Sequence, residues 1–476
     1  MIENRLNVVG IVAVLVVAAY AAVYSVGIAL AVLLWALAAM AARRRTAPAV
    51  VVALAFVAIV PIYWAPNLPG TTVAASPIVL MCAALAPAAL AVRKQIRIGV
   101  FDRLVIAYSV LVAIAYLVNT NGGFVGAIAG ALFSSLVPYA TFRLLGMRRE
   151  MSTAAAIGVL VGGVVSSYVA IREYRGWTNP FFALFPNGHA HAFFARADRR
   201  LGHPRPEASF WQAIALGMFL ALVVVLALGL AWRRDHRTRI PRPAIYAAAA
   251  FCVYALTENL VRGPLVMLAF AVVVLLISES RGGHYGRGVV VAVGLAVLVN
   301  VGSFANVLQL RDETFNQGSS VNLSGEYRVE IWHVVSDRSN FSLVGKQVVD
   351  ADGLGFTQAA GAGVGLKSFD NAFALIYIGY GVLALLAFAL IGLRMGKAAL
   401  FDPVSIVDKA WAAAILAAFI NLMTVNLLTQ FAHIFWVGIG LVAAAVQRAQ
   451  DERGDSDEPV DADYRLSPWN SRLSSA

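Results

Sequence analysis

The residues best suited to chemistry lie in polar stretches that interrupt an otherwise apolar chain. The first stretch, residues 257–264 (TENLVRGP), places Glu258 and Arg262 between two apolar runs. Ionisable side chains so close to apolar spans are costly and generally face a cavity or a partner. Because Pro264 suits the first turn of a following helix, Arg262 is well placed to meet a phosphate. The competing interpretation is an ion pair between Arg262 and Glu258 at a helix junction.

The second stretch, residues 324–333, lies within a long polar excursion that covers residues 306–371. Arg328 and Trp332 are four residues apart, so they share one face if this stretch is helical. A guanidinium group binds phosphate oxygens in a forked geometry, and an indole ring packs against the face of a sugar. The pair therefore suits a sugar diphosphate. The alternative is a surface helix with Trp332 at the membrane interface.

The third stretch places Asp370 and Asn371 at the start of an apolar run that extends over residues 372–393. A carboxylate there can orient or deprotonate an acceptor hydroxyl group. Aspartate is also a favoured helix N-cap, so Asp370 has an equally simple structural interpretation.

A fourth stretch, residues 172–208, combines basic side chains with aromatic ones and includes Arg172, His203 and Arg205. Such a loop suits an anionic glycolipid or a saccharide, or alternatively the headgroups of the surrounding lipid. His189 and His191 do not share a helical face, and no third ligand accompanies them. We therefore expect neither a metal site nor any other cofactor.

The composition defines the elements that must position these stretches. The chain is 60% hydrophobic and 13% charged, and its mean hydropathy is +0.76. Apolar runs of near 20 residues recur, each long enough to cross a hydrocarbon core of ~30 Å. These features predict an all-α polytopic membrane protein with about 12–14 transmembrane helices and two long extracytoplasmic loops, residues 172–208 and 306–370. Cys82 and Cys252 lie in apolar runs and imply no disulfide framework.

The net charge of +11 comes largely from short loops between alternate apolar runs, so it predicts topology rather than binding to nucleic acid. These basic loops are residues 43–45, 93–94, 148–149, 233–239, 281–287 and 394–397. The positive-inside rule places them, and both termini, in the cytoplasm. We expect one transmembrane domain over residues 1–447 and a disordered acidic tail over residues 448–476.

The apolar runs predict individual spans, of which two lie within residues 6–42. The others are expected at residues 48–65, 73–92, 102–118, 123–142, 152–171, 209–232, 243–257, 262–278, 288–304, 371–393, 409–426 and 428–447.

Over about residues 172–393, the chain resembles the bacterial O-antigen ligase/polymerase family in the order of its motifs. The residues that carry the resemblance are Arg262-Gly263, Arg328 with Trp332, Gly345 and Gly355, Asp370-Asn371, and Gly379 with Gly381. Upstream, residues 202–210 resemble the family's proline-containing approach to an earlier span. Val261 stands where the family usually has serine, and Asp370 stands where ligases more often have histidine. The second difference favours a polymerase.

The resemblance implies a metal-independent glycosyl transfer at the outer face of the bacterial cytoplasmic membrane. The donor would be a polyprenyl-diphosphate-linked oligosaccharide, and the acceptor would be a glycan or glycolipid. Arg262 and Arg328 would hold the leaving diphosphate, while Asp370, or else Glu258, would orient or deprotonate the acceptor. The further substrate-binding candidates are Arg172, His203, Arg205, Trp332 and Asn371.

Three alternatives remain at this point. They are a transporter or flippase of an anionic lipid-linked saccharide, a protein O-oligosaccharyltransferase, and a scaffold of an envelope complex. A transporter would be expected to carry paired repeats, and none is evident in the sequence.

Overall fold

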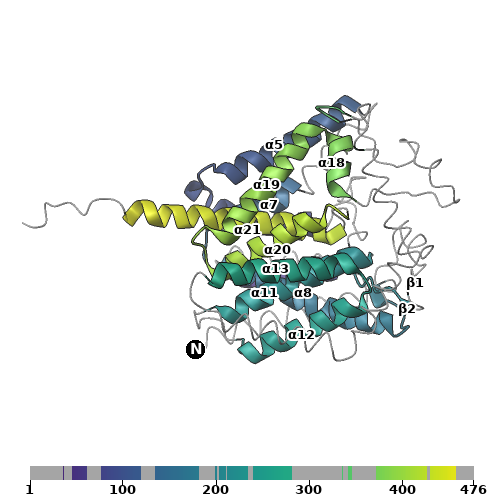
Figure 1. Ribbon diagram of the computed structural model, residues 1–476. Helices are drawn as coiled ribbons and strands as arrows, with labels where there is room; N and C mark the ends of the chain where they lie inside the picture. Colours follow the sequence, from purple (N-terminus) through teal and green to yellow (C-terminus); the bar gives the residue numbers. More distant parts are fainter. Residues whose placement is uncertain are drawn as a thin grey trace, which may run out of the picture.

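The computed structural model is a bundle of α-helices (Figure 1). It describes Ala36, Val335 and residues 46–61, 77–119, 135–181, 199–200, 203–210, 212–233, 240–280, 341–345, 371–425 and 429–456. Within these residues there are twelve α-helices: α3 (Thr46–Ile59), α4 (Pro77–Leu90), α5 (Val100–Asn119), α7 (Val137–Leu145), α8 (Met151–Tyr174), α11 (Ala213–Trp232), α12 (Arg242–Glu258), α13 (Arg262–Ser280), α18 (Ala372–Tyr380), α19 (Val382–Leu400), α20 (Ile406–Asn421) and α21 (Thr429–Ser456). A 3-10 turn (Arg93–Gln95) and a short antiparallel pair, β1 (Arg199–Arg200) and β2 (His203–Pro204), complete the described elements.

The expected class, an all-α polytopic membrane protein, is confirmed. Six helices of the described chain are long and apolar enough to cross a membrane: α5, α8, α11, α13, α19 and α21. Helix α11 is apolar all round and buried along nearly its whole length, as expected for a helix at the centre of a bundle. It packs against α8, α12, α13 and α20.

Small residues allow neighbouring helices to approach closely. A Cβ atom at Gly158 of α8 would lie 2.5 Å from the carbonyl oxygen of Val51 on α3. One at Gly163 would lie 2.6 Å from the side chain of Val223 on α11. Glycine at such positions is typical of membrane helix interfaces, where association depends on close packing. These contacts hold α3, α8 and α11 together.

The expected single span over residues 371–393 is wrong, because the structure divides it into α18 and α19. Gly381 lies between them with φ of 90°, a conformation that glycine adopts readily. The segment 341–345 packs against this break, and the backbone N–H of Val382 donates to Ser342 O at 3.0 Å. A side chain at Gly345 would collide with the backbone of Gly379. The break therefore brings together three glycines that carry the family resemblance.

The expectation of a disordered tail from residue 448 is also wrong, because α21 continues to Ser456. Asp451 lies 3.4 Å from Arg97, and Glu452 pairs with Arg149. The acidic residues thus meet basic residues from distant loops, and these pairs support the last turns of the helix. Residues 457–476 lie outside the described residues.

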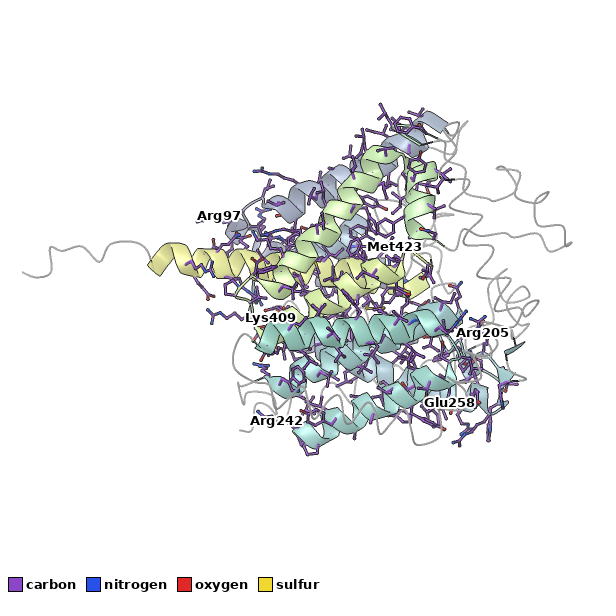
Figure 2. The ribbon with its side chains drawn as sticks, viewed as in Figure 1. Arg97, Arg205, Arg242, Glu258, Lys409 and Met423 are labelled. Carbon is purple, nitrogen blue, oxygen red and sulfur yellow. The ribbon has the colours of Figure 1, made fainter. Side chains whose placement is uncertain are left out.

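The two ends of the bundle differ in their polar residues (Figure 2). We call the end that carries Arg97, Arg242 and Lys409 the basic end, and the end that carries Arg205 and Glu258 the site end. Helix α12, which begins at Arg242 and ends at Glu258, connects the two.

Candidate functional site

The first motif forms the turn between α12 and α13 at the site end. Helix α12 ends at Glu258, and α13 begins at Arg262. Leu260 between them has φ of 58°, and this left-handed conformation costs a non-glycine residue about 1–2 kcal/mol. Backbone strain of this kind is often retained at functional sites. The strained turn keeps Glu258 and Arg262 at the same end of the bundle.

Glu258 is a buried carboxylate with one oxygen atom unpaired within the described structure. Its residue is 6% exposed, and its Oε2 atom accepts no hydrogen bond from the described residues. Burying an unpaired polar group is costly. Glu258 is therefore suited to accept a hydrogen bond from a polar group of a ligand.

Residues 203–210, here called the lead-in, run from β2 towards α11 and border the same end. The Oε2 atom of Glu173 accepts hydrogen bonds from the backbone N–H groups of Ala208 (2.7 Å) and Glu207 (3.1 Å). Asn179 Nδ2 donates to Ala208 O at 2.7 Å. Ala208 has φ of 47°, so these contacts hold the lead-in in a strained turn.

Three further contacts attach the lead-in to separate helices. Ser209 Oγ donates to Ala58 O of α3 at 2.7 Å, and Asn259 Nδ2 at the end of α12 donates to Pro206 O at 3.1 Å. Gln430 Nε2 of α21 donates to Ser209 O at 2.7 Å. Sequence reasoning missed Glu173, Asn179 and Gln430. The available signal was their occurrence beside or inside apolar runs.

Arg172, near the end of α8, is half-buried and contacts two aromatic side chains. Its guanidinium carbon is 3.3 Å from the centroid of the Trp177 ring, and its Nη1 atom donates to Tyr168 Oη at 2.8 Å. Trp177 and Tyr168 are 59% and 54% exposed. Exposed aromatic rings with an arginine are typical of a membrane interface, which favours the headgroup interpretation of Arg172.

The lead-in carries the other two basic candidates. His203 is exposed, and its ring stacks on Tyr174 with a centroid distance of 4.6 Å. Arg205 is half-buried and lies at the site end (Figure 2). Arg205 directly precedes Pro206, whose carbonyl oxygen accepts a hydrogen bond from Asn259 at the end of α12, so Arg205 lies close to the α12–α13 turn.

The N-cap of α18 is Asn371. Its Oδ1 atom accepts a hydrogen bond from Ala374 N at 3.0 Å, and the residue is 2% exposed. The capping role that the sequence offered to Asp370 thus belongs to its neighbour. This use of Oδ1 gives Asn371 a structural role at a position where the sequence predicted a substrate contact.

The end of α20 lies between the two motifs. On one side, the backbone N–H of Ala372 donates to Leu422 O at 2.9 Å and to Val425 O at 3.0 Å. On the other side, a Cβ atom at Gly263 would lie 2.6 Å from Asn421 Oδ1. Arg262-Gly263 and Asn371-Ala372 are more than 100 residues apart in sequence, and this helix end brings them together. Sequence reasoning missed Asn421, which is the last residue of α20.

Arg328, Trp332 and Asp370 lie outside the described residues, as do His189 and His191. Within the described ranges, no group of three or more histidine, cysteine, aspartate or glutamate residues is placed to hold a metal ion.

A comparison with models of known protein families and with curated protein sequences found no match. The family resemblance therefore rests on the sequence motifs alone.

Proposed function

We propose that the protein is a membrane glycosyltransferase of the O-antigen ligase/polymerase type. It transfers or polymerises oligosaccharide from a polyprenyl-diphosphate donor onto a glycan acceptor at the outer face of a bacterial cytoplasmic membrane. The observation that carries this proposal is the meeting of Arg262-Gly263 and Asn371-Ala372 at the end of α20. Two motifs with separate predicted roles, donor binding and acceptor activation, share one place in the fold.

In the proposed reaction, an acceptor hydroxyl oxygen attacks the anomeric carbon of the donor sugar. The bond between that carbon and the diphosphate oxygen breaks, and polyprenyl diphosphate leaves. Arg262, together with Arg328, stabilises the negative charge that grows on the diphosphate. The N-terminal end of α13 adds partial positive charge at the same place.

The hydroxyl proton passes to a carboxylate, for which the chain offers two candidates. Asp370 directly precedes Asn371, the N-cap of α18, in the sequence. Glu258 is buried at the other motif, and its Oε2 atom has no hydrogen-bond partner among the described residues. A positioned base typically accelerates such a step by a factor of about 10²–10⁴.

The position of the site favours transfer over transport. Glu258, Arg262, Asn371 and Asn421 all lie at helix ends, whereas the substrate sites of transporters generally lie near the middle of the membrane. With the basic end in the cytoplasm, these groups face the outer surface, where a flipped lipid-linked oligosaccharide is presented.

The direct test is glycan transfer by purified full-length protein in detergent with a polyprenyl-diphosphate oligosaccharide. We expect elongated or transferred glycan from the wild type, because transfer, unlike transport, requires no second compartment. Arg262→Ala should lower the rate at least about 100-fold, while Arg242→Ala at the basic end should leave it unchanged. Wild-type rates in Arg262→Ala protein, or no product from wild-type protein supplied with the envelope lipids of its own cell, would refute the proposal.

A further inference from the structure

We propose that a cavity at the basic end binds a small zwitterion, a phosphate group joined to an ammonium group as in phosphoethanolamine. The cavity has a volume of about 160 Å³ and lies between the start of α20, the last turns of α21 and the loop from α7 to α8. One of its lining residues, Asp408, directly precedes Lys409 at the basic end (Figure 2). A single water needs about 10–15 Å³, so a larger polar group fits.

The deeper part of the cavity carries a pair of opposite charges, Arg448 and Asp408. Their side chains are 12% and 4% exposed, and Arg448 Nη2 donates to Asp408 Oδ2 at 3.3 Å. Ser405 Oγ donates to the same oxygen at 2.6 Å, whereas Asp408 Oδ1 has no partner among the described residues. Arg448 Nη1 donates to the carbonyl oxygen of Gly146, and the other N–H groups of this guanidinium make no further bond within the described chain. Both members of the pair therefore keep hydrogen-bonding capacity for a ligand.

A second pair of opposite charges, Arg149 and Glu452, lines the mouth of the same cavity. Their side chains are 77% and 55% exposed, and Arg149 Nη2 donates to Glu452 Oε1. Exposed ion pairs contribute little to stability. This pair can therefore open to admit a ligand without disturbing the fold.

The balance of charge in the cavity selects the class of ligand. Two arginines and two carboxylates line it, so a simple anion would meet repulsion from the carboxylates and a simple cation would meet repulsion from the arginines. A zwitterion avoids both. Its phosphate oxygens can accept forked hydrogen bonds from Arg149 and Arg448, and its ammonium group can donate to Glu452 and Asp408.

The rest of the cavity wall suits the short hydrocarbon link between the two charged groups. It is apolar and consists of Pro403, Val404, Ala445 and Ala449. Phosphoethanolamine reaches a protein either as the headgroup of phosphatidylethanolamine or as the free compound. The chemistry recognised is the same, and the test below distinguishes the two sources. None of the lining residues takes part in the proposed transfer reaction, so this inference does not rest on the proposed function.

The test measures dissociation constants by titration calorimetry on purified full-length protein in a non-ionic detergent. The probes are dihexanoyl phosphatidylethanolamine, dihexanoyl phosphatidylglycerol, O-phosphoethanolamine and inorganic phosphate. We expect each phosphoethanolamine compound to bind at least about fivefold more tightly than the anion of matched size, because its ammonium group offsets the repulsion from the carboxylates. Tighter binding of the lipid than of O-phosphoethanolamine assigns the ligand to the membrane, and the reverse assigns it to the free compound.

Two substitutions at the mouth test the two halves of the ligand separately. Arg149→Gln removes a charged donor and should raise the dissociation constant of the preferred ligand at least about fivefold. Glu452→Gln should also raise it, because the ammonium group loses a partner. Arg97→Gln is the matched control, since Arg97 is likewise exposed and pairs with Asp451 on the last turns of α21 but does not line the cavity. Its dissociation constant should stay within about twofold of the wild type.

All three substituted side chains are exposed, and the melting temperature without ligand establishes that each variant is folded. Equal affinity for the phosphoethanolamine compounds and the matched anions would overturn the proposal. Unchanged affinity in Arg149→Gln, or an equal loss in Arg97→Gln, would do the same. Tighter binding in Glu452→Gln would also overturn it, because that result defines a site for a simple anion.

Discussion

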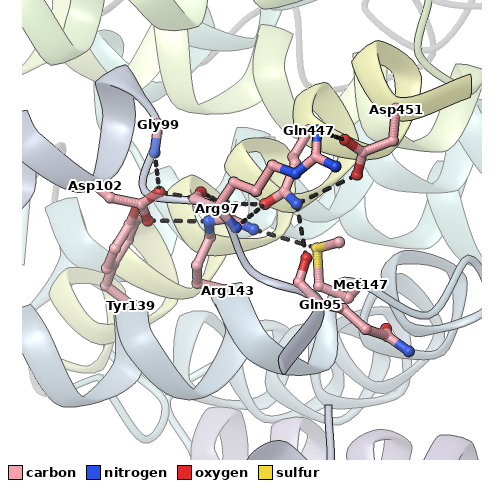
Figure 3. A network of polar contacts seen from close by, with 9 residues as sticks. All are labelled: Gln95, Arg97, Gly99, Asp102, Tyr139, Arg143, Met147, Gln447 and Asp451. Atoms are coloured by element: carbon pink, nitrogen blue, oxygen red, sulfur yellow. Dashed lines mark hydrogen bonds and ion pairs between the residues drawn. The ribbon is translucent and has the colours of Figure 1, made fainter. Parts of the chain in front are cut away.

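Two buried polar clusters, one at each end of the bundle, differ in how completely their groups are paired. At the basic end, the Asp102 carboxylate accepts hydrogen bonds from Arg143 Nε (3.0 Å), Tyr139 Oη (2.7 Å) and Gly99 N (2.8 Å) (Figure 3). Arg143 Nη2 also donates to Gln447 Oε1 at 2.6 Å. These contacts join the start of α5 to α7 and α21.

At the site end, Glu258 Oε2, Asn259 Oδ1 and Asn421 Nδ2 are buried and have no partners within the described chain. A buried network in which every polar group is hydrogen-bonded makes a structure rigid. Buried groups without partners lower the stability and add no rigidity. We infer that the Asp102 cluster stabilises the fold. Buried unpaired atoms also occur near the basic end, for example Asp408 Oδ1, so the assignment of Glu258 to a ligand depends on the proposed function. Substitutions at the two clusters should therefore affect different measurements.

The largest effect is expected for Arg143→Ala, which would leave the Asp102 carboxylate buried and uncompensated. Breaking a buried ion pair on one side typically costs about 3–5 kcal/mol. The midpoint of thermal or denaturant unfolding in detergent should fall strongly, while the transfer rate per folded molecule stays near that of the wild type. The double change Asp102→Asn with Arg143→Met should recover much of the loss. If Arg143→Ala protein kept the unfolding midpoint of the wild type but lost transfer activity, the Asp102 cluster would have a functional role instead of a stabilising one.

Glu258→Gln should show the opposite pattern. Because Glu258 Oε2 is buried without a hydrogen-bond partner in the described chain, replacing the carboxyl group by an amide should leave the unfolding midpoint nearly unchanged. If Glu258 accepts the acceptor proton, the transfer rate should fall by about 100-fold or more. Glu150→Gln, a substitution at an exposed position before α8, serves as the control. A fall in rate of less than about twofold would leave Asp370 as the base.

Glu173→Gln should have a smaller and mixed effect, because Glu173 holds the lead-in to α8. Exchanging the carboxylate for an amide weakens two charge-assisted bonds to Ala208 and Glu207, at a cost of about 1–2 kcal/mol. The unfolding midpoint should fall modestly. The KM for the donor should rise severalfold with little change in kcat, since Arg205 on the lead-in loses its positioning. An unchanged KM would restrict Glu173 to a role in stability.

The smallest effect is expected for Arg172→Ala. Arg172 is half-buried and packs against the exposed Trp177 ring, and substitutions near the surface usually change free energies by less than about 0.5 kcal/mol. Transfer in detergent should remain within about twofold of the wild type. A large loss of rate would return Arg172 to the substrate-binding residues predicted from the sequence.

Several helices could be predicted closely because hydrophobic length is a local property of the chain. The apolar run 262–278 became α13 (Arg262–Ser280), and the run 102–118 became α5 (Val100–Asn119). The break at Gly381 could not be predicted in this way, because it depends on packing of the segment 341–345 against residues 379–382. The extension of α21 was missed because the partners of Asp451 and Glu452 lie more than 300 residues away.

The sequence by itself determined the membrane class, the separation of basic loops and the position of Glu258 and Arg262 between two helices. Each of these follows from local composition. Charged residues are costly within a bilayer, so they are concentrated outside the apolar spans and mark where the spans end. Only the tertiary structure decided that Asn371 rather than Asp370 caps α18, that Glu173 anchors the lead-in, and that Asn421 lies between the two motifs. Hydrogen bonds and close contacts between distant residues are set by helix packing. They cannot be predicted from a local sequence pattern.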